Sequence, residues 1–246
     1  MCTFVDMVPP FRELANKSMG SMLEAQKCQL FELISPRLAS FKEALSSNES
    51  VSEWDDAETA LRAALYHLRH LAQPWSQVLS REVYHLAIGE QALGIVRVFN
   101  VPCDISYAML VILGNLVDTI FTLLLDPILS ADAITDASSR FVHSLFLDAA
   151  RSSADVFLVG ESTVMNPATN PAETSQQMEV ATNYCMLFNK LQCIGQFMVM
   201  RLDDIMRGLE DGMFRSVTGK ELTHLITAAY DESAKRNALL KALASK

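Results

Sequence analysis

The sequence predicts an all-α protein, and three observations support this fold class. Nearly every long segment repeats its apolar residues at intervals of three and four, which is the spacing of one helix face. We find no run in which apolar and polar residues alternate strictly, as a half-buried strand requires. Half of the 246 residues are apolar and 20% are charged, so the chain can bury a substantial core.

The first predicted helix follows a short extended run at residues 3–8 and a stop at Pro9 and Pro10. A kink is expected at Pro36, and the polar stretch "SSNES" closes the helix. A chain that opens on such a run, without a tail or a capped helix, reads like the interior of a longer protein. One face of this helix carries six apolar residues: Met19, Met22, Leu23, Leu30, Leu33 and Ile34.

A second helix is predicted to begin at Ser52, with Asp55 three residues on as a weak capping partner. Pro74 is expected to end this helix. Its apolar residues repeat every seven positions, which lets two helices lie side by side at a shallow angle. This heptad seam comprises Trp54, Leu61, Leu68 and Trp75, with Ala57, Ala64 and Leu71 three residues after the first three.

Breaks marked by proline and polar residues separate the helices that follow, which we place at 81–99, 104–125, 132–159, 178–200 and 202–211. The stretch 160–177 holds two Asn-Pro pairs and almost no large apolar residue, so we interpret it as a linker. The predicted organisation is a helical bundle over 1–159 and a C-terminal helical part over 178–246 that packs on the same rod.

The final helix is predicted to begin at Thr218, because Thr218 and Glu221 form a T-x-x-E capping box. Lys235, Arg236 and Lys241 are assigned to its C-terminal end, where the helix dipole favours cations. Its apolar stripe comprises Leu222, Leu225, Ile226, Ala229, Leu239, Leu240 and Leu243.

Charge and hydropathy limit the function classes. The net charge of −9, from 20 basic and 29 acidic residues, argues against nucleic acid as a main ligand. Residues 101–150 hold six Asp and a single Arg, Arg140, which fits a basic partner surface or a solvated helix face, and we favour the solvated face. The longest charge-free run of the most apolar region, Ile105–Val117, has 13 residues, whereas a bilayer needs about 20, so we predict a buried helix in a soluble protein.

The five cysteines are scattered and have no metal-ligand spacing, and the N-terminus lacks a basic-then-apolar export signal. We therefore expect a reducing, cytoplasmic compartment. Cys185 and Cys193 stand eight residues apart on an apolar helix, and packing accounts for them better than nucleophilic catalysis. The full set is Cys2, Cys28, Cys103, Cys185 and Cys193.

Two acidic or glycine-bearing stretches resemble known sites only in part. In "GMFRSVTGKE", Gly212 and Gly219 have six residues between them and Glu221 follows Lys220, which does not fit a phosphate loop, so we predict a turn and a helix cap. In "LDDIMRGLED", Asp203 and Asp204 form the acid pair that a magnesium-dependent helical enzyme would use.

The magnesium interpretation is the rival rather than the favoured one. Arg207 stands where a third acid would help, and no second acidic cluster is evident, so a charged, exposed face is favoured. His67 and His70 stand three residues apart on the heptad helix, but no acid completes a metal site at helical spacing. We interpret both as surface histidines. We predict no catalytic residue, cofactor or metal.

Three phrases of the sequence resemble the Zeste White ten family of kinetochore and vesicle-tethering proteins. They are "TFVDMVPPFREL" with "AQKCQLFELIS", then "WSQVLSREVY", then "ELTHLITAAYDESAKRNALLKAL", and they occur in family order from residue 3 to the end. Over 80–127 the chain carries about one helix more than the family, judged from typical helix lengths. The matching positions are Thr3–Asp6, Val8, Pro9, Phe11, Arg12, Ala25–Lys27, Trp75, Val78, Leu79, Tyr84, Leu225, Ile226, Ala229, Tyr230, Arg236, Leu239 and Leu240.

The resemblance implies the C-terminal portion of a longer protein, built as elongated stacked helical bundles of the tethering-complex type. It implies a non-enzymatic scaffold, acting in capture of Golgi-to-ER retrograde vesicles with SNAREs, or in kinetochore and checkpoint assembly with dynein recruitment. The implied partner is a helical-solenoid subunit, Rod-like or its vesicle-complex counterpart. Membrane association is then peripheral, at the endoplasmic reticulum and through the complex. A helical subunit of another tether, such as exocyst, is an alternative.

Partner-contact residues stay unassigned by motif. Apolar surface in excess of the core would mark a docking site, and we expect such surplus at Trp54, at Trp75 and over Met109–Leu125.

Overall fold

The computed structural model describes residues 4–47, 51–78, 105–158, 178 and 181–244. Every regular element in these ranges is a helix and none is a strand, which confirms the all-α prediction for this part of the chain. The predicted helix at 81–99 and the predicted linker at 160–177 lie outside the described residues, so the division into two parts stays a prediction.

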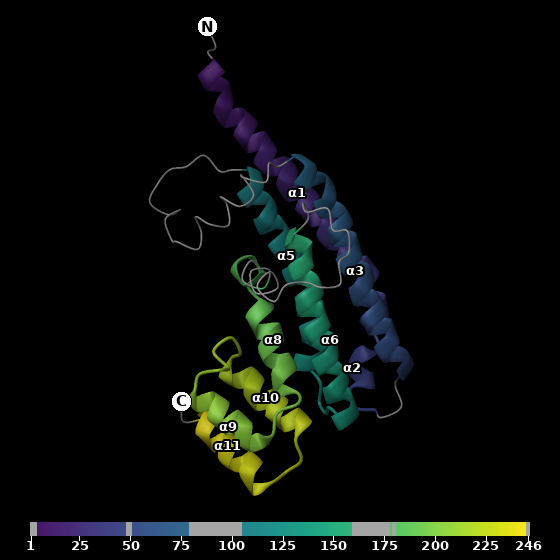
Figure 1. The fold of residues 1–246 in the computed structure, drawn as a ribbon, viewed down its shortest axis with the longest axis vertical. Coiled ribbons are helices and arrows are strands. Elements are labelled where there is room, and N and C mark those ends of the chain that lie inside the picture. Colours follow the sequence, from purple (N-terminus) through teal and green to yellow (C-terminus); the bar gives the residue numbers. More distant parts are fainter. Residues whose placement is uncertain (1–3, 48–50, 79–104, 159–177, 179–180, 245–246) are drawn as a thin grey trace, which may run out of the picture.

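Four long helices form the body of the molecule, and Figure 1 shows them running alongside one another. A short helix, α2 (Phe41–Ala44), follows the first of them, and a 3₁₀ turn, η2 (Asp155–Leu158), follows the last. The four are α1 (Phe4–Leu38), α3 (Val51–Val78), α5 (Ile105–Leu129) and α6 (Asp136–Ala154).

Shorter helices complete the fold at the end of the body that lies away from the N-terminus (Figure 1). Helix α8 packs against α5 and α6, and α11 packs against α9 and α10. These helices are α8 (Phe188–Phe197), α9 (Leu202–Glu210), α10 (Gly219–Ala229) and α11 (Ala234–Ala244). Buried side chains from both groups of helices join into one apolar core.

Helix α5 is the central core helix. Its side chains at Leu116, Ile120 and Phe121 are fully buried. Within the described residues, the stretch Val111–Leu129 has the length and composition of a membrane span, with a mean hydropathy of 1.7, but 56% of it is buried inside the protein. The prediction of a buried helix here agrees with that burial.

The heptad seam of α3 is confirmed, because its small and branched members face the core. Ala57, Leu61, Ala64 and Leu68 are buried, and Leu71 packs against the same core. On α1, Leu30 and Ile34 are buried while Met22, Leu23 and Leu33 pack at the edge of the core. The side chains of Met19 and Trp75 lie outside the described residues.

The expected surplus of apolar surface at Trp54 and along α5 is not found. Trp54 stacks on Phe141 of α6, with ring centroids 5.2 Å apart, and packs against the core. The apolar side chains described over 111–125 are buried or packed on the same core. The described side chains at these predicted positions therefore pack within the chain, and a docking surface has to be sought elsewhere.

Several predicted helix ends are wrong, and two of them were placed by proline. The extended run at 3–8 is the start of α1, which continues through Pro9 and Pro10. Pro9 and Pro10 are the sixth and seventh residues of α1, beyond the four N–H groups that lack a partner, so each removes one backbone hydrogen bond without ending the helix. Helix α3 likewise continues past Pro74, since a single proline kinks a helix without always ending it.

The start of α3 is also wrong, because it lies at Val51, one residue before the predicted cap. The Ser52 hydroxyl bonds to the adjacent carboxylate of Glu53 at 2.8 Å, so Ser52 and Asp55 do not form the expected capping pair.

The final predicted helix is two helices. Thr218 and Glu221 form the capping box of α10 as predicted, but the helix ends at Ala229 and Tyr230 takes an extended conformation. Helix α11 then starts at Ala234, so Lys235 and Arg236 lie in its first turn. Their assignment to a helix C-terminus is therefore wrong, whereas Lys241 does lie in the last turn.

Candidate docking surface on helix α8

Helix α8 begins where the sequence predicts an unbroken helix over 178–200. The chain is helical at 181–184, leaves the helix at 185–187 and resumes at Phe188. The N-cap residue, Leu187, has no capping side chain of its own. Asp118 of α5 supplies the cap instead, because its carboxylate accepts from the N–H groups of Met186 at 2.9 Å and Leu187 at 3.0 Å.

The C-terminal end of α8 is also held by side chains from other helices. The Nδ1–H of His143 on α6 donates to the carbonyl of Gly195 at 2.7 Å. The hydroxyl of Tyr230, just after α10, donates to the carbonyl of Met200 at 2.6 Å. Gly195 is among the last four residues of α8, whose carbonyls have no partner within the helix, and Met200 lies three residues past the helix end, so both bonds satisfy groups that would otherwise need water.

Close backbone packing fixes the inner side of α8 and of the turn that precedes it. A Cβ added at Gly195 would lie 3.0 Å from Cβ of Phe146 on α6, and one added at Gly114 would lie 2.1 Å from the carbonyl oxygen of Tyr184. At Gly114 only glycine permits this approach, and at Gly195 a larger residue would force Phe146 to shift. Helix α8 is therefore packed closely against α5 and α6 along one side.

Lys190 anchors α8 to the start of α10. Its Nζ lies 2.6 Å from Oε1 of Glu221, and both side chains are mostly shielded from solvent. Burial pushes the pKa of Glu221 up, but the bonds from Lys190 and from Thr218 outweigh burial and hold that pKa below its ordinary value. The acid of the capping box thus has two tasks, since it also joins two helices.

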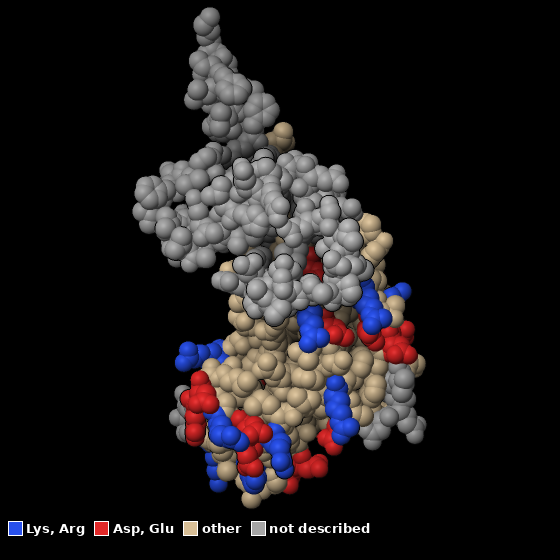
Figure 2. Space-filling view, in the orientation of Figure 1, with Lys and Arg blue, Asp and Glu red and all other residues tan. Residues whose placement is uncertain are grey.

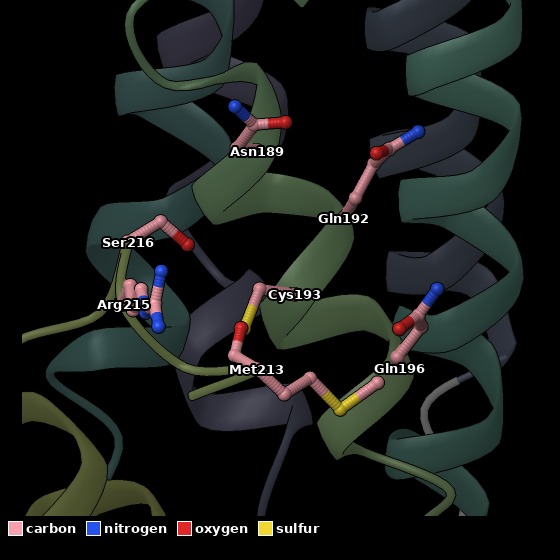
Figure 3. A pocket seen from close by; sticks show the side chains of 7 residues that line it. All are labelled: Asn189, Gln192, Cys193, Gln196, Met213, Arg215 and Ser216. Atoms are coloured by element: carbon pink, nitrogen blue, oxygen red, sulfur yellow. The ribbon is translucent and has the colours of Figure 1, made fainter. Parts of the chain in front are cut away.

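The outer side of α8 borders a hollow of about 310 Å³, shown in Figure 3. Three carboxamides of α8 line one wall, and the turn after α9 forms the other. Buried Cys193 lies between the walls, with its thiol 3.6 Å from the carbonyl of Met213. We call the following set the α8 face: Asn189, Gln192, Gln196, Met213, Arg215 and Ser216.

The turn that forms the second wall depends on Gly212, which has a φ of 73°. A Cβ at this glycine would lie 2.7 Å from Nε of Arg215, so the guanidinium folds closely over the turn. The stretch from Gly212 to Lys220 is thus a turn that leads into a capped helix, as predicted. It positions Arg215 at the edge of the hollow.

The side chains of the α8 face do not converge on one point. Figure 3 shows Gln192 and Gln196 on one side of the hollow and Arg215 and Ser216 on the other. Burial raises the pKa of the Cys193 thiol, which makes it a poor nucleophile. The volume is at the lower end of the range for small-molecule sites, about 300–1,000 Å³. The arrangement suits contact with a surface better than chemistry on a bound ligand.

Exposed apolar side chains flank the α8 face. Met186 precedes Asn189 by three residues and is 90% exposed, and Val199 follows Gln196 by three residues and is also exposed. Figure 2 shows a largely uncharged visible surface where α8 lies, and side chains of both signs beside it and over the C-terminal helices. Uncharged surface with exposed Met is typical of the centre of protein interfaces.

The acid pair considered for magnesium is engaged by cations. Nζ of Lys235 lies 2.8 Å and 2.7 Å from the two carboxylate oxygens of Asp203, and it holds the pKa of Asp203 below its ordinary value. Asp204 accepts from Arg207 at 2.5 Å. In the part of the chain that the structure describes, no group of three His, Cys, Asp or Glu side chains could hold a metal.

The remaining candidates are also separated from one another. Nε2 of His67 lies 2.8 Å from Oε1 of Gln26 on α1, whereas His70 packs edge-on against Tyr66. Cys185 is buried, and that burial, together with the charge of Asp118, raises the pKa of its thiol. These residues have structural partners.

Sequence reasoning missed the residues that build the α8 face. Asp118, His143 and Tyr230 act on backbone groups 69, 52 and 30 residues away, and such pairings leave no local pattern. The run of Asn189, Gln192 and Gln196 at spacings of three and four was visible as a polar stripe, but it has no catalytic signature.

No model of a protein family matches this sequence. The chain is 34% identical over 87 residues to the centromere/kinetochore protein zw10 homolog of Mus musculus, an alignment that covers 35% of this chain and 10% of the mouse protein. It is 32% identical over 87 residues to the rat (Rattus norvegicus) homolog, with 35% and 11% covered. The matched segment therefore spans about a tenth of the length of these curated relatives, and the resemblance is shown for that segment.

Proposed function

We propose that this chain is a non-enzymatic scaffold that works by binding other proteins within a tethering or kinetochore complex. The observation that carries the proposal is the 87-residue match, at 34% identity, to a centromere/kinetochore protein. The sequence phrases that resemble the same family run beyond the matched length, in family order. The engagement of Asp203 and Asp204 by Lys235 and Arg207 supports a scaffold over the magnesium-dependent rival.

The more specific form of the proposal follows from the family resemblance. The chain acts in capture of Golgi-to-ER retrograde vesicles with SNAREs, and it has a second role in kinetochore and checkpoint assembly. Its direct partner is a helical-solenoid subunit, Rod-like or the vesicle-complex counterpart. It is cytoplasmic, and it reaches the endoplasmic reticulum membrane through the complex. The architecture proposed for it is the stacked helical bundle of tethering subunits.

The rigid seating of α8 supports a scaffold role in physical terms. A docking surface has to keep its shape without the partner, because ordering a mobile surface on binding costs affinity. Bonds from Asp118, His143 and Tyr230 fix both ends of α8 before any partner arrives.

Affinity purification of the tagged chain from its own cells tests the proposal. The expected result is recovery of tethering-complex or kinetochore subunits, among them a helical solenoid, identified by mass spectrometry. Recovery of exocyst subunits would instead favour the alternative tether. A preparation in which none of these proteins exceeds the untagged control would contradict the proposed function.

A further inference from the structure

We propose that the α8 face is the docking surface for a helix of the partner protein, and that this helix carries an Asp or Glu side chain opposite Arg215. The proposal rests on the proposed function, and it assigns a surface and a partner chemistry to it. The α8 face is the wall of carboxamides on α8 together with Met213, Arg215 and Ser216.

We expect an acidic residue on the partner helix because Arg215 carries a positive charge that needs a partner. Arg215 is exposed and takes part in no ion pair with another described residue, and the other members of the α8 face are uncharged. The nearby cation on α8, Lys190, is already paired with Glu221. A guanidinium at the edge of an uncharged interface gains most from a partner carboxylate, because the two groups can form a bidentate contact.

The side-chain amides on α8 and the exposed apolar side chains next to them indicate which side chains the rest of the partner surface should carry. Asn189, Gln192 and Gln196 form no hydrogen bond with another described residue, so each has a free donor and a free acceptor. Met186 and Val199 lie beyond the two ends of this row. A partner with polar uncharged side chains at its centre and apolar side chains at both ends matches this order.

A helix is the partner element that fits the geometry. The described part of the chain has no strand, so it offers no sheet edge to which an extended peptide could add. Asn189, Gln192 and Gln196, spaced at three and four along α8, line one wall of the hollow, and Met213, Arg215 and Ser216 line the other. Side chains of a helix fill such grooves between ridges.

Charge reversal tests the surface, with the helical-solenoid subunit of the tethering complex from the same cells as the probe. Arg215→Glu and Gln192→Glu are each expected to weaken binding about tenfold or more, because like charges then face each other or an uncharged centre gains a charge. Arg140→Glu is the matched control, since Arg140 is also exposed but lies on α6 outside the α8 face. Circular dichroism melting verifies that each variant is folded.

A photo-crosslinker at Gln192 then identifies the partner element. We expect a crosslink to a helix that carries an acidic residue, and we expect reversal of that residue to Lys to restore binding to Arg215→Glu. Wild-type affinity in both face variants would overturn the inference and leave the proposed function intact. A crosslink to a second copy of this chain, or to a non-helical segment, would also overturn it. If the wild-type chain does not bind the solenoid subunit at all, the proposed function fails and the inference fails with it.

Discussion

The carboxylate of Asp118 on α5 lies 3.0 Å from the backbone nitrogen of Leu187, the N-cap residue of α8, although the two residues are 69 positions apart. Capping side chains usually come from the N-cap residue itself. Here the cap is tertiary, so the start of α8 depends on its position against α5. The surface that we propose for docking thus depends on a contact between α5 and the N-terminal end of α8.

Removal of this cap should destabilise the protein. Asp118→Ala leaves the N–H groups of Met186 and Leu187 without an acceptor, and we expect a loss of about 1–2 kcal/mol in the free energy of unfolding. Chemical denaturation measures the change. Asp126→Ala on the exposed side of α5 is the control, and it should change the free energy by less than about 0.5 kcal/mol. Equal effects from the two substitutions would show that Asp118 does not act as a cap.

The same residue should make stability depend on pH. Burial raises the pKa of Asp118 above its ordinary value of 3.8, against the opposing effect of the two backbone bonds. The folded state therefore binds the proton more tightly than the unfolded state does. This contribution to stability is complete below the unfolded pKa and is lost as the pH rises through the folded pKa.

Denaturation of wild type and Asp118→Asn across this pH range tests the sign. The asparagine variant cannot titrate at this position. The stability advantage of wild type over the variant should shrink as the pH rises from 3.8 towards neutral. An advantage that grows with pH would mean that the folded-state pKa is depressed, contrary to the burial of the carboxyl group.

Gly114 provides a test of the close packing between α5 and the segment before α8. The Cβ of Gly114→Ala would lie 2.1 Å from the carbonyl oxygen of Tyr184, so we expect a loss of about 1–3 kcal/mol or more from overpacking. Gly20→Ala on α1 is the matched control, because nothing lies within 4 Å of its Cβ. That substitution should stabilise the helix by about 0.5–1 kcal/mol. Thermal and chemical denaturation should therefore show shifts of opposite sign.

Tyr230 should stabilise the other end of α8 through its hydroxyl group. Burial raises the pKa of Tyr230 to about 12, so the hydroxyl remains a donor at neutral pH. Tyr230→Phe keeps the ring contact with Phe197 but removes the bond to Met200, and it should cost about 0.5–1.5 kcal/mol. Tyr66→Phe, at an exposed ring on α3, should be neutral by comparison. Hydrogen exchange at the end of α8 should increase only in the Tyr230 variant.

Local patterns predicted the parts of the fold that depend on neighbouring residues. The heptad seam from Ala57 to Leu68 and the capping box at Thr218 each need only residues within one helix, and both are present. The break at 185–187 was not predicted, because the bonds that hold it come from Asp118, on a distant helix. At 230–233 a local signal was overlooked, since the hydroxyl of Ser233 accepts from the N–H of Arg236 at 3.2 Å and caps α11. Proline was given too much weight at Pro9, Pro10 and Pro74, where a helix continues.

The existence of a docking surface was predicted from the sequence, but its position was not. The resemblance to a scaffold family indicates that some surface binds a protein, but the expected surplus of apolar groups at Trp54 and on α5 is buried in the core. The surface that remains is instead polar at its centre, with exposed Met186 and Val199 beyond its ends. Its position follows from the packing of α8, which no single helix pattern contains.

Sedimentation velocity of the purified chain, alone and mixed with the solenoid subunit of the tethering complex from the same cells, tests the central claim most directly. We predict that the mixture forms one faster-sedimenting species that contains both proteins in equal amounts. Two boundaries that keep the sedimentation coefficients of the separate proteins, at concentrations far above those in the cell, would contradict the claim that this chain is a tethering scaffold.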